Sequence, residues 1–124
     1  MKTALVVIAH GSQHAEANDD LHELTQSLRA TGRYPVVEAA FLELAEPTID
    51  EAARRCVAQG ADRVILVPYF LSAGVHVRRD LAAHRDRLAQ AFPNREFSLA
   101  EPLAGHPSLI EIVLQRAKES EPRP

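Results

Sequence analysis

The chain alternates between short continuous apolar runs and longer segments in which apolar residues recur with helical spacing. The apolar runs have the length of strands and are rich in β-branched residues, which is typical of strands buried on both faces. Four strands are predicted, at residues 3–9, 36–42, 63–70 and 96–99. Four helices are predicted after them, at residues 15–30, 47–59, 77–92 and 107–118. Pro47 is expected in the first turn of the second helix, and Gly60 is expected to end that helix.

Strands and helices therefore alternate along the whole chain, and each helical crossover is long enough to join parallel strands. This order predicts a three-layer α/β/α fold with a four-stranded parallel sheet in the strand order 2-1-3-4. Such sheets bind ligands beyond the carboxyl ends of the strands, where the direction of winding changes. Here that point lies between the first and third strands. Residues 1–119 are predicted to form a single domain, followed by a frayed tail at residues 120–124.

The composition of the chain leaves the predicted fold unchanged and excludes several classes of function. The net charge of -3 is spread along the helices and gives no broad basic surface, so nucleic acid is excluded as a partner. No apolar run is long enough to span a membrane, and the chain lacks the glycine-rich motifs that bind nucleotide phosphates. The single cysteine, Cys56, lies on an apolar helix face and is interpreted as a core residue. These features favour a cytoplasmic protein that uses no nucleotide.

Three potential metal ligands follow the first three predicted strands. His10, Glu43 and His76 are equally spaced along the chain, so each strand–helix unit contributes one of them. Two imidazoles and a carboxylate form a donor set for divalent transition metals and leave coordination positions open. Each residue also has an ordinary interpretation: either histidine could be a solvated loop residue, and Glu43 could cap the next helix.

The remaining histidines and one glycine-containing turn have less specific interpretations. His14, His22 and His84 lie among charged residues at helical positions and are interpreted as solvated. His106 begins the last predicted helix, where it could line the pocket, cap the helix or pack against it. The turn at residues 10–12 could also bind an anion, as many turns before helices do.

Four motifs together resemble the sirohydrochlorin chelatase family. They cover nearly the whole chain and occur in the family's order: VVIAHGSQHAEAN, FLELAEPTIDEA, GADRVILVPYFLSAGVHVRRD and PLAGHPSLIEIVLQR. The chain is similar to the short, CbiX-like members of the class II chelatases, which need no ATP. The resemblance implies insertion of cobalt, iron or nickel as divalent ions into sirohydrochlorin, with cobalt expected first, on routes to cobalamin or siroheme.

The resemblance also implies roles for particular residues. His10 and His76 match the metal-binding histidines of the family, and Glu43 stands where a family carboxylate often assists. The substrate carries several carboxylates, for which Ser12 and Gln13 after His10, and Arg78 and Arg79 after His76, are candidate partners. Larger relatives contain two such halves around one cleft, so this single half is expected to act as a homodimer.

Two rival functions make different predictions. A metallochaperone would hold a cation at the same histidines without a large hydrophobic cleft. The chelatase instead predicts a cleft lined by Pro68, Tyr69, Phe70 and Leu71. A phosphate binder built on the turn at residues 10–12 would not depend on His76. For Arg78 and Arg79, the alternative is an exposed helix turn that pairs with Asp80.

Overall fold

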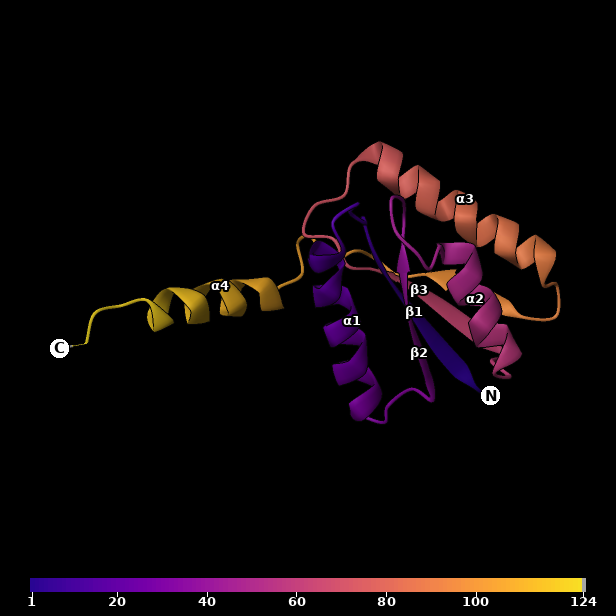
Figure 1. The fold of residues 1–124 in the computed structure, drawn as a ribbon, viewed down its shortest axis with the longest axis horizontal. Coiled ribbons are helices and arrows are strands. Elements are labelled where there is room, and N and C mark those ends of the chain that lie inside the picture. The colour runs from indigo at the N-terminus through magenta and orange to yellow at the C-terminus, as the bar shows by residue number, and fades with distance from the viewer. Residues whose placement is uncertain (124) are drawn as a thin grey trace.

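The computed structural model describes residues 1–123, in which four strands and four helices alternate (Figure 1). Their bounds are β1 (Thr3–Ala9), α1 (Ala15–Ala30), β2 (Val36–Phe41), α2 (Ile49–Ala58), β3 (Arg63–Pro68), α3 (Val75–Ala91), β4 (Glu96–Leu99) and α4 (Ser108–Glu119). The predicted elements are all present, with differences of a few residues at their ends.

The four strands form one parallel sheet in the order β2-β1-β3-β4, which confirms the predicted topology. Helix α1 lies on one face of the sheet, and α2 and α3 lie on the other (Figure 1). β1 occupies an inner position, where Ile8 pairs with Ala40 on β2 and with Pro68 on β3. The carboxyl ends of β1, β2 and β3 therefore meet at one edge of the sheet.

The core is divided in two by the alternation of side chains along the strands. On β1, Ala4, Val6 and Ile8 face α2 and α3, whereas Leu5 and Val7 face α1. This explains why the strand reads as a continuous apolar run, since both of its faces are covered.

Helix α2 begins later than predicted. Thr48 is its N-cap: the Thr48 hydroxyl accepts a hydrogen bond from the backbone N–H of Glu51, and the Glu51 carboxylate accepts one from the N–H of Thr48. Pro47 precedes this capping box, so its assignment to the first helical turn was wrong. The Thr-x-x-Glu pattern was the sequence signal for this start, because the paired side chains satisfy backbone donors that the helix leaves free.

Two strands end earlier than predicted, β2 at Phe41 and β3 at Pro68. Helix α3 begins at Val75, two residues before the predicted start, so His76 lies within its first turn. The physical reason for the shorter β3 is that its partner β1 ends at Ala9, and pairing with β1 extends only as far as Pro68.

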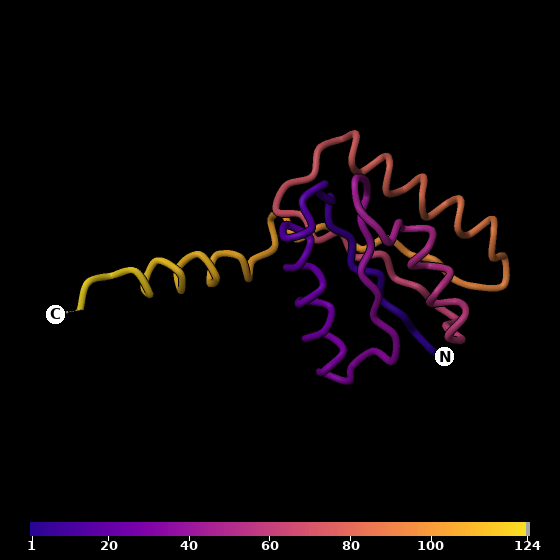
Figure 2. Tube along the Cα trace, viewed as in Figure 1, coloured from indigo at the N-terminus to yellow at the C-terminus, as the bar shows by residue number. Residues whose placement is uncertain are grey.

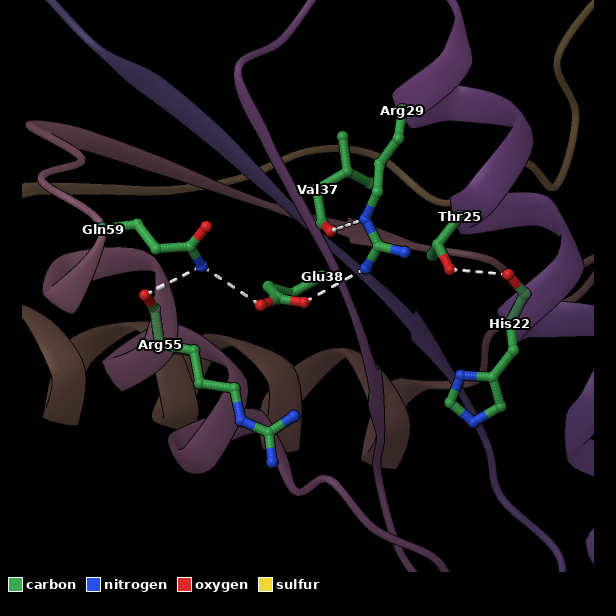
Figure 3. A network of polar contacts seen from close by, with 7 residues as sticks. All are labelled: His22, Thr25, Arg29, Val37, Glu38, Arg55 and Gln59. Carbon is green, nitrogen blue, oxygen red and sulfur yellow. Dashed lines mark hydrogen bonds and ion pairs between the residues drawn. The ribbon is translucent and has the colours of Figure 1, made fainter.

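Glu38 on β2 joins helices from the two faces of the sheet (Figure 3). Its carboxylate accepts hydrogen bonds from Arg29 of α1, at 3.2 Å, and from Gln59 after α2, also at 3.2 Å. Arg29 additionally donates to the backbone oxygen of Val37 at 2.8 Å. Because β2 is an edge strand, these contacts fix both flanking helices at the end of the sheet.

Cys56 is fully buried between α2 and the sheet, which confirms its assignment to the core. Burial, reinforced by the negative charge of Glu38, raises the pKa of the Cys56 thiol from 9.0 to about 12. Since the thiolate is the reactive form, its fraction near pH 8 is expected to be roughly a thousand-fold lower in the folded protein. Iodoacetamide labelling followed by mass spectrometry should therefore modify Cys56 only after denaturant is added. Equal labelling rates with and without denaturant would contradict this burial.

Helix α4 lies apart from the three layers and extends beyond α1 (Figures 1 and 2). None of its residues is buried, although Ile110, Val113 and Leu114 are large and apolar. The predicted single domain at residues 1–119 and frayed tail at 120–124 stay predictions, and position 124 lies outside the described residues. No helix within residues 1–123 combines the length and apolar composition that crossing a bilayer requires.

Candidate functional site

The loops after β1 and β2 run side by side beyond the edge of the sheet. The backbone N–H of Leu42 donates to the oxygen of Ala9 at 2.9 Å, and that of Glu43 donates to the oxygen of His10 at 3.0 Å. Hydrogen bonding between the two chain segments thus continues past the ends of both strands. It carries His10 and Glu43 to the same place.

His10 and Glu43 form a direct contact, with 2.8 Å between Nε2 of the imidazole and Oε1 of the carboxylate. Their side chains are 54% and 56% exposed, so both remain open to a ligand. A carboxylate can only accept, so Nε2 carries the proton that is shared with Glu43. In the neutral ring, Nδ1 then holds a free lone pair for a metal ion or a proton.

Gly11 permits this close approach of the two loops. Its φ of +102° is unfavourable for any residue with a side chain. A methyl group built on Gly11 would also overlap the backbone oxygen of Glu43. The glycine is therefore required for two independent reasons, its backbone conformation and its nearness to the neighbouring loop.

Asn18 of α1 holds the turn that follows His10. Its side-chain oxygen accepts from the backbone N–H of Ser12 at 3.0 Å, and its amide nitrogen donates to the backbone oxygen of Ser12 at 3.0 Å. The sequence reasoning did not identify Asn18. An amide side chain early in the helix that follows a glycine turn was the available signal, because asparagine commonly satisfies backbone groups of such turns.

Leu44, beside Glu43, was also not identified. It adopts a φ of +64°, which is rare for a residue other than glycine and costs on the order of 1–3 kcal/mol. Its side chain is exposed. The sequence contains no glycine here to signal a turn, so the strain in the loop after β2 is visible only in the structure.

A hollow of about 550 Å³ lies beside His10 on the α1 side of the sheet edge. Tyr69, Phe70 and Leu71 line it, as predicted for a chelatase cleft, and the edge of the His10 ring meets the Phe70 ring at 6.3 Å between centroids. Pro68 was also predicted to line the cleft, but it is buried in β3 and does not line this hollow. As the last residue paired with β1, Pro68 is enclosed by the sheet.

The structure does not bring His76 to the His10–Glu43 pair. His76 is exposed in the first turn of α3, and the loop at residues 69–74 separates it from β3. Within residues 1–123, no group of three or more histidine, cysteine, aspartate or glutamate side chains is arranged to hold a metal ion. A single chain therefore assembles two of the three predicted ligands, and the role of His76 stays a prediction.

The four predicted rim residues are distributed around this edge. Ser12 lines the hollow and Gln13 is exposed beside it. Arg78 pairs with Glu101 at 3.1 Å, instead of the Asp80 considered from sequence, and donates to the backbone oxygen of Ala73 at 3.3 Å.

Arg79 is exposed on the first turns of α3, as a rim residue would be. Two further histidines have surroundings that the sequence did not specify. Nδ1 of His106 accepts from the backbone N–H of Ser108, the first residue of α4, at 3.1 Å. His84, interpreted as solvated, is instead half-buried, and burial together with nearby Arg87 lowers its pKa.

Comparison with known proteins decides the family. The family model described as CbiX matches residues 4–120. This chain belongs to the CbiX family. It is 37% identical over 117 residues to the sirohydrochlorin cobaltochelatase of Priestia megaterium, an alignment that covers 94% of this chain and 38% of that protein. It is 36% identical over 112 residues to the chloroplastic sirohydrochlorin ferrochelatase of Arabidopsis thaliana, covering 90% and 50%. The family resemblance inferred from the four motifs is thereby confirmed.

CbiX proteins of this size also occur among solved structures. The crystal structure of a putative cobalamin biosynthesis CbiX protein from Marinobacter aquaeolei VT8 matches with a TM-score of 0.81 and 31% identity, covering 94% of this chain and 95% of that one. The two chelatases named above are much longer, and this chain spans half of their length or less. The fold is thus shared both by short chains and by one part of larger proteins.

Proposed function

We propose that this chain inserts a divalent metal ion into sirohydrochlorin. The observation that carries the proposal is the His10–Glu43 contact, 2.8 Å long, at a sheet edge beside an aromatic-lined hollow. The names of the relatives supply the substrate class, a tetrapyrrole, and two metals, cobalt and iron. Imidazole and carboxylate donors accept cobalt, iron and nickel alike, and we propose cobalt(II) first.

The reaction needs a weakly held cation and a base on one face of the macrocycle. Two pyrrole N–H protons leave as the metal enters, and in this proposal Nδ1 of His10 accepts one of them or holds the ion. Glu43 orients the ring and favours the imidazolium that forms when a proton is taken up. In this proposal His76 supplies a second imidazole. Ser12, Gln13, Arg78 and Arg79 bind the carboxylates of the substrate, which requires Arg78 to release Glu101.

The proposal includes a symmetric homodimer as the acting unit. The longer relatives contain about twice or more the length of this chain, so two copies would supply two halves around one cleft. Pairing would also bring further ligands to the His10–Glu43 pair, which a single chain leaves with two. We place this enzyme in the cytoplasm, within tetrapyrrole biosynthesis leading to cobalamin or siroheme.

The test is anaerobic absorbance of sirohydrochlorin mixed with cobalt(II), iron(II) or nickel(II), with and without the protein. We expect the wild type to accelerate the spectral change of metal insertion for at least one of the three ions, and cobalt(II) to react fastest. If the protein adds nothing to the spontaneous rate with any ion but binds the metal in equilibrium dialysis, the metallochaperone function replaces this one. If the protein binds phosphate and His76→Ala leaves that binding unchanged, the anion-binding alternative is favoured instead.

A further inference from the structure

A second, smaller hollow of about 200 Å³ lies between helix α3 and the chain that leaves β4. The loop at residues 69–74 separates it from the hollow beside His10, which lies on the α1 side of the sheet. A depression of this size holds one small chemical group and is too small for a whole macrocycle. Its apolar lining consists of Pro68, Ala73, Leu81, Leu99, Ala100 and Pro102.

The remaining lining residues are all charged, namely Arg78, Arg85 and Glu101. Arg78 and Arg85 lie two turns apart on one face of α3, with the buried side chain of Leu81 between them. Two guanidinium groups against one carboxylate leave the hollow with an excess of positive charge. Its chemistry therefore favours an anionic group.

Glu101 occupies one of the two arginines. Its Oε2 atom lies 3.1 Å from Nη1 of Arg78. The backbone N–H of Ala100 donates to the oxygen of Leu66 at 2.9 Å, which continues the strand pairing past β4 and brings Glu101 to the carboxyl edge of the sheet. The Glu101 side chain is 85% exposed. An ion pair this exposed is weak, because water solvates the free carboxylate nearly as well.

Arg85 has no stronger attachment. It contacts the carboxylate of Asp86, its neighbour on the same helix, at 3.0 Å, and the Asp86 side chain is 63% exposed. Both guanidinium groups can therefore turn to a ligand at little cost. Arginine binds a carboxylate through two parallel hydrogen bonds, a geometry that favours a carboxylate over a less planar anion.

The position of this hollow relative to the His10–Glu43 pair suits a substituted macrocycle. β4 lies two strand spacings from β1, which is about 10 Å. With bonds of about 1.5 Å, a carboxylate on a short arm lies on the order of 8–9 Å from the centre of a tetrapyrrole. A ring centred near the pair can therefore extend one arm over the loop at residues 69–74.

We propose that the hollow between α3 and β4 receives one carboxylate arm of the tetrapyrrole, bound by Arg78 and Arg85, and that Glu101 occupies Arg78 until this arm displaces it. The proposal rests on the function proposed above and adds Arg85 and Glu101 to it. Arg85 is then a substrate-binding residue, and Glu101 is an internal competitor for the substrate carboxylate. The exchange breaks no covalent bond, since one carboxylate replaces another.

The test is a titration of sirohydrochlorin into the full chain without metal, followed by the absorbance of the macrocycle. Arg85→Gln is expected to raise the dissociation constant about 10-fold, because charge-assisted hydrogen bonds to the arm are lost. Glu101→Gln is expected to lower the dissociation constant about 3-fold, because the competitor loses its charge. A purely structural role of the Arg78–Glu101 pair would not make binding tighter when that pair is broken.

The chain contains a matched ion pair for the control. Arg63 and Glu96 begin β3 and β4 at the opposite edge of the sheet, 2.8 Å apart, with side chains that are 43% and 60% exposed. Arg63→Gln and Glu96→Gln should leave the dissociation constant unchanged. The fully esterified macrocycle carries no carboxylate, so the wild type and Arg85→Gln should bind it equally. Circular dichroism confirms that each variant is folded.

The outcomes separate this site from the proposed reaction. Equal affinity of the wild type and Arg85→Gln for sirohydrochlorin would overturn the site. Glu101→Gln protein that binds no more tightly than the wild type would overturn the displacement. Because the titration contains no metal, either result leaves metal insertion to its own assay. The expected binding pattern without metal insertion would instead remove the proposed reaction and retain this site, and a wild type that does not bind sirohydrochlorin would overturn both.

Discussion

Replacing His10 with alanine is expected to lower the rate of cobalt insertion into sirohydrochlorin by about 10²–10⁴-fold, the range typical for loss of a positioned acid–base group. The reason is that the mutation removes the only nitrogen of the His10–Glu43 pair that is free to take up a proton or hold the ion. The side chain is 54% exposed, so the fold should survive its removal. The measurement is the anaerobic absorbance change, with circular dichroism to confirm folding. His76→Ala is expected to cause a comparable loss if the proposed second imidazole is correct.

Two matched variants separate the role of His10 from general effects of mutation. His14→Ala removes another exposed histidine that makes no side-chain hydrogen bond at the start of α1, and it should leave the rate unchanged. Glu43→Gln retains an oxygen that accepts from Nε2 but removes the negative charge, so a smaller loss, on the order of 10-fold, is expected. A folded His10→Ala protein with the wild-type rate would contradict the proposed site.

Replacing Gly11 with alanine is expected to lower the free energy of unfolding by about 2–4 kcal/mol and to abolish metal insertion. The substitution adds a side chain at a φ of +102° and places its methyl group against the backbone oxygen of Glu43. Relief of that overlap requires the two loops to separate, which breaks the hydrogen bond between Glu43 and His10 backbones. Urea denaturation measures the stability, and the absorbance assay measures the activity.

Gly32→Ala provides the matched control for Gly11. Gly32 also has a positive φ, +68°, but a methyl group there would have no atom within 4 Å. It should therefore show only the conformational cost, about 1–2 kcal/mol, and retain activity. Equal stability losses in the two variants, with activity kept in both, would show that the approach of the loops does not matter.

The sequence was sufficient for the architecture because buried parallel strands and amphipathic helices leave periodic signals. The apolar run at residues 3–9 predicted β1, and the spacing of the following helix predicted α1 within the bounds observed. Helix starts were less predictable where two signals competed. Pro47 suits a first turn, but the paired side chains of Thr48 and Glu51 satisfy more backbone groups and determine the start.

The sequence predicted the site only in part, for reasons that particular residues make clear. Equal spacing after successive strands identified His10 and Glu43, and parallel strands do bring their ends to one edge. The same spacing included His76, which the structure places on α3 apart from that pair. Asn18 was missed because the turn that it holds is closed by a contact across six residues, for which the sequence has no periodic signal.

By itself, the sequence determined the alternation of strands and helices and the parallel sheet, because these follow from local propensity and from the repeat of apolar positions. Only the tertiary structure decided that His10 and Glu43 touch, that Gly11 lets their loops approach, and that α4 leaves its own sheet. These depend on backbone angles in loops and on hydrogen bonds between distant segments. An apolar helix face shows that a partner is needed, but the path of the connecting chain decides which surface it can reach.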